Sequence, residues 1–214
     1  ETAVLKLWQG LGYYSRARNL HFTAKYIAET LNGEFPNSYK SLLSLKGVGD
    51  YTASAIASIC YEEPVAVVDG NVYRVLARYF GIDTPINSTE GVKKFKKLAE
   101  SLLPLSNFGD YNQAIMEFGS QQCKPQSPNC KLCPLISSCK AYATGSIKTL
   151  PVKLKKTKVS KKYFNFLVID SDDHKTYLER RTKKGIWQQL YQFPLIETPT
   201  SLSEKEFIMH FKSS

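Results

Sequence analysis

Four of the five cysteines lie within seventeen residues, in a loop with the spacing C-x6-C-x2-C-x5-C. Four thiolates brought together in this way suit a [4Fe–4S] cluster or a structural zinc ion. Zinc ribbons usually pair two close C-x-x-C knuckles and this loop has one, so the spacing favours the iron–sulfur cluster. Zinc stays open as the alternative, and free structural cysteines are the third. The four residues are Cys123, Cys130, Cys133 and Cys139.

Asp69 is a second residue that could do chemistry, because it stands where an apolar run meets the start of an expected helix. A carboxylate at that point can cap the helix, since Asp is a preferred N-cap residue. It can also stabilise positive charge that develops in a transition state. The residues alone favour the cap, because capping aspartates are far more common than catalytic ones. Cys60, in an apolar context, is predicted to be an ordinary core residue.

The turn Gly47-Val48-Gly49 separates an apolar run from a helix rich in small residues. Two glycines two positions apart permit a tight turn with positive φ and leave no side chains in the way. The N–H groups of the turn and of the new helix then face outward and can bind an anion such as a DNA phosphate. An ordinary glycine-capped connection between two helices is the alternative.

Apolar periodicity predicts an all-α first part and a mixed second part. Helices are expected at about 1–11, 13–31, 36–45, 50–60, 71–80, 89–103 and 110–121. Strands are expected at 164–169 and 176–181 with 170–175 as their turn, then another strand after the loop at 185–194, and a helix at 203–211. We predict a helical domain over 1–147, a basic linker over 148–162 and a partial α+β domain over 163–214.

The chain carries a net charge of +10, and seven lysines without any acid fall in residues 148–162. This favours a polyanionic partner, nucleic acid first, although a solvated linker has the same composition. No stretch is long and apolar enough to span a membrane, and no signal peptide is seen. The clustered cysteines indicate a reducing compartment, the cytoplasm with the bacterial nucleoid or the nucleus. Because the chain starts inside an expected helix, we read it as a fragment of a longer protein, shortened at both ends.

Three stretches together resemble the helix–hairpin–helix DNA glycosylases with an iron–sulfur loop, the superfamily of endonuclease III. They are residues 45–53, residues 68–76 and the cysteine loop, and residues 8–20 narrow the resemblance to the MutY branch. The resemblance covers about residues 4–150 and implies a mainly α glycosylase domain with a [4Fe–4S] loop. From residue 163 the chain looks like the beginning of the family's Nudix-like domain, without the Nudix hydrolase signature.

The resemblance implies base-excision DNA repair. A MutY-type enzyme hydrolyses the N-glycosidic bond of a flipped-out adenine that is mispaired with 8-oxoguanine or guanine. Its partner would be double-stranded DNA that contains such a mismatch, with no membrane partner, and we expect a monomer.

The resemblance also implies roles for single residues. Asp69 would be the catalytic carboxylate, Tyr51 and Asn71 would line the substrate pocket, and the four cysteines would hold the cluster. Tyr13 would wedge into the duplex; the alternative is an interior aromatic. Gly47, Val48 and Gly49 would bind a phosphate, with a monovalent cation on the carbonyl groups of the hairpin.

Tyr51 separates two sub-branches of the family, and the chain departs from the family where the general acid and the C-terminal Phe-Ser-His-type hairpin are expected. Bifunctional relatives have a lysine at the position of Tyr51, and a phenol cannot form their Schiff base, so a monofunctional enzyme is expected. The family's general-acid glutamate lies on an earlier helix that has no counterpart before Glu1. We therefore expect this fragment to bind duplex DNA without measurable adenine excision. A non-catalytic iron–sulfur DNA-binding module is the alternative function.

Overall fold

The computed structural model describes residues 1–155 and 160–212. Its internal contacts divide the chain into two units, which are described separately. The first comprises Glu1–Leu7 and Ser15–Lys155, and the second comprises Trp8–Tyr14 and the chain from Lys156 onward. The lysine-rich stretch falls partly outside the described residues, since Lys156 and Lys158 are not among them. The domain boundary within it therefore stays a prediction.

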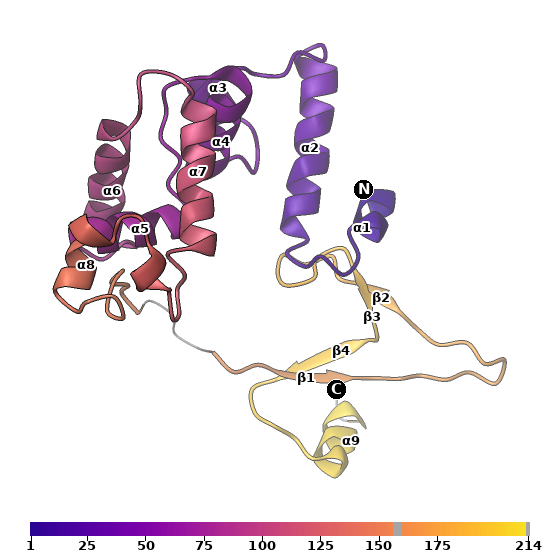
Figure 1. The fold of residues 1–214 in the computed structure, drawn as a ribbon. Coiled ribbons are helices and arrows are strands. Elements are labelled where there is room, and N and C mark those ends of the chain that lie inside the picture. The colour runs from indigo at the N-terminus through magenta and orange to yellow at the C-terminus, as the bar shows by residue number, and fades with distance from the viewer. Residues whose placement is uncertain (156–159, 213–214) are drawn as a thin grey trace. The chain divides into compact units, whose positions relative to one another are not determined.

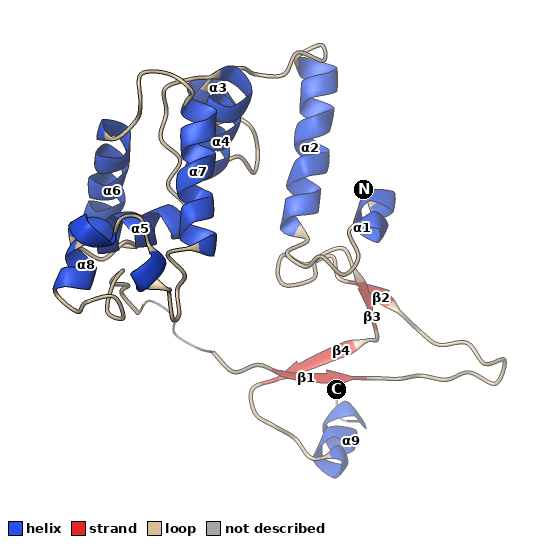
Figure 2. Ribbon diagram, in the orientation of Figure 1, coloured by secondary structure: helices blue, strands red, loops and turns tan. Residues whose placement is uncertain are grey.

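The first unit is built from helices, as the periodicity predicts (Figure 1). They are α1 Thr2–Leu7, α2 Ser15–Thr30, α3 Tyr39–Leu42, α4 Asp50–Tyr61, α5 Gly70–Phe80, α6 Thr89–Ser101, α7 Phe108–Gln121 and α8 Lys140–Ala143. The 3-10 turns η1 Cys130–Leu132 and η2 Ile136–Ser138 lie in the cysteine loop. Figure 2 shows helices joined by loops throughout the described part of this unit.

The third helix is much shorter than the predicted range 36–45. The Ser38 side chain accepts a hydrogen bond from the backbone N–H of Ser41 and sets the start of α3 at Tyr39. Past Leu42 the backbone makes the tighter bonds Ser44 N to Ser41 O (3.2 Å) and Leu45 N to Leu42 O (3.1 Å). Such i to i+3 bonds end an α-helix in a turn, which here leads directly into the glycine hairpin.

Two apolar clusters hold the first unit together. One includes Val72 and Leu76 of α5 and Phe95 of α6, and α5 also packs against α7 and α8. The other lies under the glycine hairpin, where Leu42 and Leu45 meet the small residues of α4. The two clusters fix the ends of α4 and α5 on which the candidate site is built.

Cys60 is exposed, so its prediction as a core residue was wrong. The buried positions of α4 are Ala53, Ser54, Ala57 and Ser58, which form one face of the helix at i, i+1, i+4 and i+5 spacing. Cys60 follows two positions later and falls on a different face.

The second unit contains two short antiparallel ribbons and one helix. β1 Tyr163–Phe166 pairs with β4 Leu195–Thr198, with Tyr163 opposite Thr198. β2 Glu179–Arg180 pairs with β3 Tyr191–Gln192, and α9 Glu204–Lys212 follows.

The predicted turn at 170–175 forms, since Asp170 bridges to Thr176 and Ser171 N donates to Lys175 O (2.9 Å). The predicted pairing of the strands 164–169 and 176–181 was wrong, because among the described residues their ladder does not extend beyond this turn. β2 pairs with β3 instead, because Arg181 N donates to Leu190 O (2.9 Å) and Gln189 N donates to Arg181 O (2.7 Å), which closes the loop between them. Within the described residues, no helix has both the length and the apolar character needed to cross a bilayer.

Candidate functional site

In the glycine hairpin, only the first glycine, Gly47, has a backbone conformation that other residues rarely adopt. Gly47 has φ +85°, and a Cβ added there would lie 2.6 Å from Cβ of Asn19 on α2. The neighbouring residue is held to α2 as well, because Thr23 Oγ1 donates to Lys46 O at 2.8 Å. Gly47 therefore serves both the left-handed turn and the close approach of α2.

Gly49 plays a different part, since its φ of −98° suits any residue. We expected both glycines to serve the turn through positive φ, and this holds for Gly47 alone. A Cβ at Gly49 would meet nothing within 4 Å, so the space beside it is open. Gly49 is also the N-cap of α4 and offers no side-chain hydrogen bond. The first-turn N–H groups of α4 are thus left for an acceptor from outside the helix.

Asp69 caps helix α5, as the residues alone favoured. Its Oδ1 accepts from the backbone N–H groups of Asn71 and Val72, both at 2.8 Å. Its Oδ2 accepts from Nδ2 of the Asn71 side chain, also at 2.8 Å. Three donors therefore fix the orientation of one half-buried carboxylate. The same rigidity would serve a catalytic carboxylate, which must be held in place before charge develops.

A buried arginine connects this carboxylate to the cysteine loop. Arg74 is only 7 % exposed, and burial lowers the pKa of its guanidinium. Its Nη2 donates to Oδ1 of Asn71 (2.9 Å) and to Gly119 O, while its Nε donates to Cys123 O (2.7 Å). Gly119 lets α7 pack closely on the start of α5, because a Cβ there would lie 2.7 Å from Cβ of Asn71. Asp69 and Cys123 are thus two ends of one chain of hydrogen bonds.

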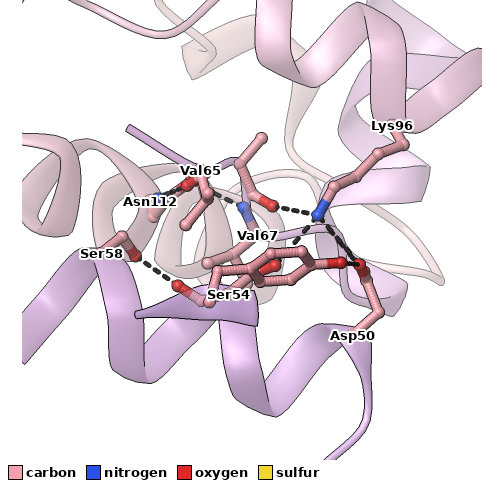
Figure 3. Close-up of polar contacts among 9 residues, drawn as sticks. Asp50, Ser54, Ser58, Val65, Val67, Lys96 and Asn112 are labelled. Atoms are coloured by element: carbon pink, nitrogen blue, oxygen red, sulfur yellow. Dashed lines mark hydrogen bonds and ion pairs between the residues drawn. The ribbon is translucent and has the colours of Figure 1, made fainter. Parts of the chain in front are cut away.

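The segment that leads to Asp69 is held by a buried asparagine of α7. Asn112, 1 % exposed, accepts from Val67 N at 3.0 Å and donates to Val65 O at 2.9 Å (Figure 3). These two bonds satisfy backbone groups that an extended segment would otherwise leave unpaired inside the protein. Asn112 therefore fixes the path of the chain just before the candidate catalytic residue.

The four cysteines of the loop line one small cavity of about 30 Å³, together with Ile136, Tyr142 and Ile147. Burial, and after it the neighbouring Cys123, Cys133 and Cys139, raises the pKa of the Cys130 thiol. Across residues 1–155 and 160–212, no three Cys, His, Asp or Glu side chains converge closely enough to hold one metal ion.

A second buried arginine fixes the loop from the side of α5. Arg78, 2 % exposed, donates to the carbonyl oxygens of Lys124 (2.7 Å), Pro125 (3.1 Å) and Leu150 (3.0 Å). Its Nη1 also lies 3.5 Å from Sγ of Cys123. For Cys130, the positive charge of Arg78 opposes in part the rise in thiol pKa that burial and the neighbouring cysteines cause. The donor set, four thiols around one cavity in a loop fixed by Arg78, therefore fits an iron–sulfur cluster.

The two tyrosines of the predicted site are exposed. Tyr51 is the second residue of α4 and 48 % exposed. Tyr13 belongs to the second unit, where Trp8 Nε1 donates to Gly12 O (3.1 Å) across the turn that precedes it. Tyr13 is 83 % exposed, so the alternative of an interior aromatic was wrong.

Three residues of the site were not found from the sequence. Arg74 and Arg78 carried a signal that could have been used, because two arginines four positions apart share the apolar face of α5. Asn112 carried none, since an asparagine within a helical pattern does not reveal which backbone it will reach.

These features define a class: a helix–hairpin–helix protein with an open helix start at the hairpin, a fixed carboxylate at the start of the next helix and a cysteine loop tied to that helix. Residues 1–104 match the family profile described as "HhH-GPD superfamily base excision DNA repair protein", so this helical part of the chain is similar to that superfamily.

The chain is also similar to adenine DNA glycosylases. It is 39 % identical over 195 residues to that of Buchnera aphidicola subsp. Baizongia pistaciae, a match that covers 90 % of this chain and 54 % of the relative. It is 46 % identical over 139 residues to the adenine DNA glycosylase of Homo sapiens, a match that covers 64 % of this chain and 26 % of the relative. The chain thus spans about half the length, or less, of these relatives.

Solved structures support the same fold. A thermostable thymine-DNA glycosylase matches with a TM-score of 0.61 and 31 % identity, over 67 % of this chain and 66 % of that one. Endonuclease III in a non-covalent complex with DNA matches with a TM-score of 0.58 and 27 % identity, over the same shares. The mainly helical endonuclease III-like fold predicted from the sequence is therefore confirmed.

Proposed function

We propose that the protein acts as a monofunctional adenine DNA glycosylase that removes adenine opposite 8-oxoguanine or guanine. The observation that carries the proposal is the Asp69 carboxylate, which three hydrogen bonds hold at the start of α5. The similarity to adenine DNA glycosylases supports the choice of base.

The chemistry follows from where charge develops. As the N-glycosidic bond of a flipped-out adenosine breaks, the sugar becomes an oxocarbenium-like cation. A carboxylate fixed nearby stabilises that cation more than it stabilises the substrate, which is the condition for lowering the barrier. Asn71 contributes by holding Oδ2 of Asp69 at 2.8 Å. Tyr51 cannot attack the sugar as an amine would, so water completes the reaction and the strand is not cut.

The hairpin would hold the DNA. A phosphate fits the open side of Gly49, where the first-turn N–H groups of α4 can donate to it. The hairpin carbonyls would hold a monovalent cation, and the exposed Tyr13 is available to enter the duplex beside the oxidised guanine. These contacts act on the backbone and on stacking, so they bind double-stranded DNA before any base is chosen.

The cysteine loop would hold a [4Fe–4S] cluster through Cys123, Cys130, Cys133 and Cys139. When bound, the cluster supplies a fixed frame and a local charge rather than a reaction step. Arg74 and Arg78 would join that frame to α5. The chain from residue 163 would belong to a Nudix-like domain that recognises 8-oxoguanine.

The decisive test is Asp69→Asn in the full-length enzyme, with an A·8-oxoguanine duplex under single-turnover conditions. Asparagine caps a helix as well as aspartate does, so folding and DNA affinity should change little. Loss of the charge should slow adenine release by about 10²–10³-fold or more. Borohydride should trap no covalent adduct with either protein. Unchanged adenine release, or equal losses of affinity and rate, would favour the alternative of a non-catalytic DNA-binding module in which Asp69 is only a cap.

The cluster has its own test, with a matched control in the same chain. Protein made with iron available should be yellow-brown, and Cys133→Ser should bleach it and weaken DNA binding. Cys60→Ser should leave the colour unchanged, because Cys60 is exposed and lies outside the loop. A colourless protein that holds one zinc ion would contradict the cluster.

A further inference from the structure

Lys96 of α6 reaches a point where several parts of the first unit meet. Its Nζ lies 3.2 and 3.3 Å from the two carboxylate oxygens of Asp50 and 3.0 Å from Oγ of Ser54, both on α4. It also donates to the carbonyl oxygen of Ala66 at 2.8 Å. Figure 3 shows the ammonium group between α4 and the chain segment that holds Val65 and Val67. The Lys96 side chain is 20 % exposed, so these partners replace most of its water.

The contact between Lys96 and Asp50 matters for the hairpin because of where Asp50 lies. Asp50 is the first residue of α4 and directly follows Gly49, where the helix has no side-chain cap. A carboxylate in the first turn stabilises a helix through its dipole. The same charge repels a phosphate that approaches the same N–H groups. A phosphate-binding hairpin with an aspartate at this point therefore needs that charge balanced.

We propose that Lys96 is a positioning residue for the phosphate-binding hairpin, where it neutralises Asp50 and ties the start of α4 to the segment that leads to Asp69. The inference rests on the proposed binding of DNA by the hairpin. Lys96 does not touch the DNA or the base; it acts through Asp50 and through Ala66, three residues before Asp69.

Tyr39 supports this arrangement from a third helix. Its hydroxyl donates to Oδ1 of Asp50 at 2.5 Å, and that bond, with burial and the charge of Asp50, raises the pKa of Tyr39 to about 12. Tyr39 thus stays a donor at physiological pH. Lys96 Nζ also lies 5.3 Å from the centroid of the Tyr39 ring, within the range of a cation–π contact. Two donors therefore hold the Asp50 carboxylate.

The test measures DNA affinity by fluorescence anisotropy with an A·8-oxoguanine duplex at low and high salt. Lys96→Met keeps the length of the side chain and removes its charge, so Asp50 is left unbalanced. We expect the dissociation constant to rise about tenfold at low salt. The gap should narrow at high salt, because the repulsion is screened.

The second arm separates charge balance from folding. Asp50→Asn combined with Lys96→Met removes both charges, and its affinity should return to within about twofold of wild type. Lys97→Met changes an exposed neighbour in α6. Its dissociation constant should not show the salt-dependent difference from wild type that Lys96→Met shows. The proposal is overturned if Lys96→Met binds like Lys97→Met, or if the double variant, shown to be folded by thermal melting, binds as weakly as Lys96→Met. A wild-type protein that binds no duplex would instead contradict the proposed function.

Discussion

The N-termini of α4 and α5 solve the same problem in opposite ways. Each helix leaves N–H groups in its first turn without partners inside the helix. At α5 the carboxylate of Asp69 accepts from two of them, so the helix satisfies its own start. At α4 the N-cap is Gly49, which has no side chain to offer. One start is closed by the protein, and the other is open to a ligand.

Under the proposed function, this difference would let one unit hold a DNA phosphate at α4 and a carboxylate at α5 for separate tasks. Asp69 would lose its fixed orientation if it did not cap α5, because two of its three hydrogen bonds come from the helix backbone. Gly49 would lose its open side if it carried a cap. The contrast between the two helix starts can therefore be tested by making either one resemble the other.

The largest effect is expected from Gly47→Ala. Alanine at φ +85° is strained, and its Cβ would lie 2.6 Å from Cβ of Asn19, so the free energy of unfolding should fall by about 3 kcal/mol. Gly49→Ala is the matched control, since its φ is ordinary and its surroundings are open, and it should stay within about 0.5 kcal/mol of wild type. Denaturant unfolding measures both. Equal midpoints would refute the separate roles of the two glycines.

Gly49→Asp converts the start of α4 into that of α5. The new carboxylate can cap the helix and should leave stability unchanged or raise it by a few tenths of a kcal/mol. It should also occupy the place of the phosphate and weaken DNA binding about tenfold, or about 1.4 kcal/mol. Gly49→Asn adds the cap without the charge and should weaken binding less. Wild-type affinity in both variants would mean that DNA is held elsewhere.

Asp69→Ala opens the start of α5 without supplying a ligand. Two backbone N–H groups and Nδ2 of Asn71 would lose their acceptor, and stability should fall by about 1 kcal/mol. Asp69→Ser restores a cap to the backbone and should recover most of that loss in thermal melting. If Asp69→Ala melts like wild type, the helix does not depend on this carboxylate.

The sequence was sufficient wherever the signal was local. Apolar spacing predicted most helices of the first unit, although it made α3 too long and did not indicate α8, and a glycine pair predicted the hairpin at 47–49. The N-cap at Asp69 was predicted too, because a cap involves only the aspartate and the backbone of the next three residues. The roles of Asp69, Tyr51 and the cysteines in DNA repair stay predictions that came from the family resemblance.

The sequence failed where the partner of a residue is distant. Arg74 binds Cys123, which lies 49 positions away, and Lys96 binds Ala66 and Asp50, which lie 30 and 46 positions away. No local pattern names such partners. The pairing of the strands in the second unit was mispredicted for the same reason, since β1 pairs with β4 and not with the strand that follows it in the sequence. Short strands have weak register preferences of their own, so their pairing is decided by the rest of the unit.

The arginines of α5 also constrain how the chain is made. Arg78 binds carbonyl groups 46, 47 and 72 positions later in the chain, the last at Leu150. During synthesis, α5 leaves the ribosome well before these acceptors exist, and chains grow at only about 5–20 residues per second. A guanidinium buried without acceptors is costly, so α5 should stay partly solvated for several seconds until residue 150 emerges. The first unit should therefore complete its folding late, and its C-terminal segment should be the last part to pack.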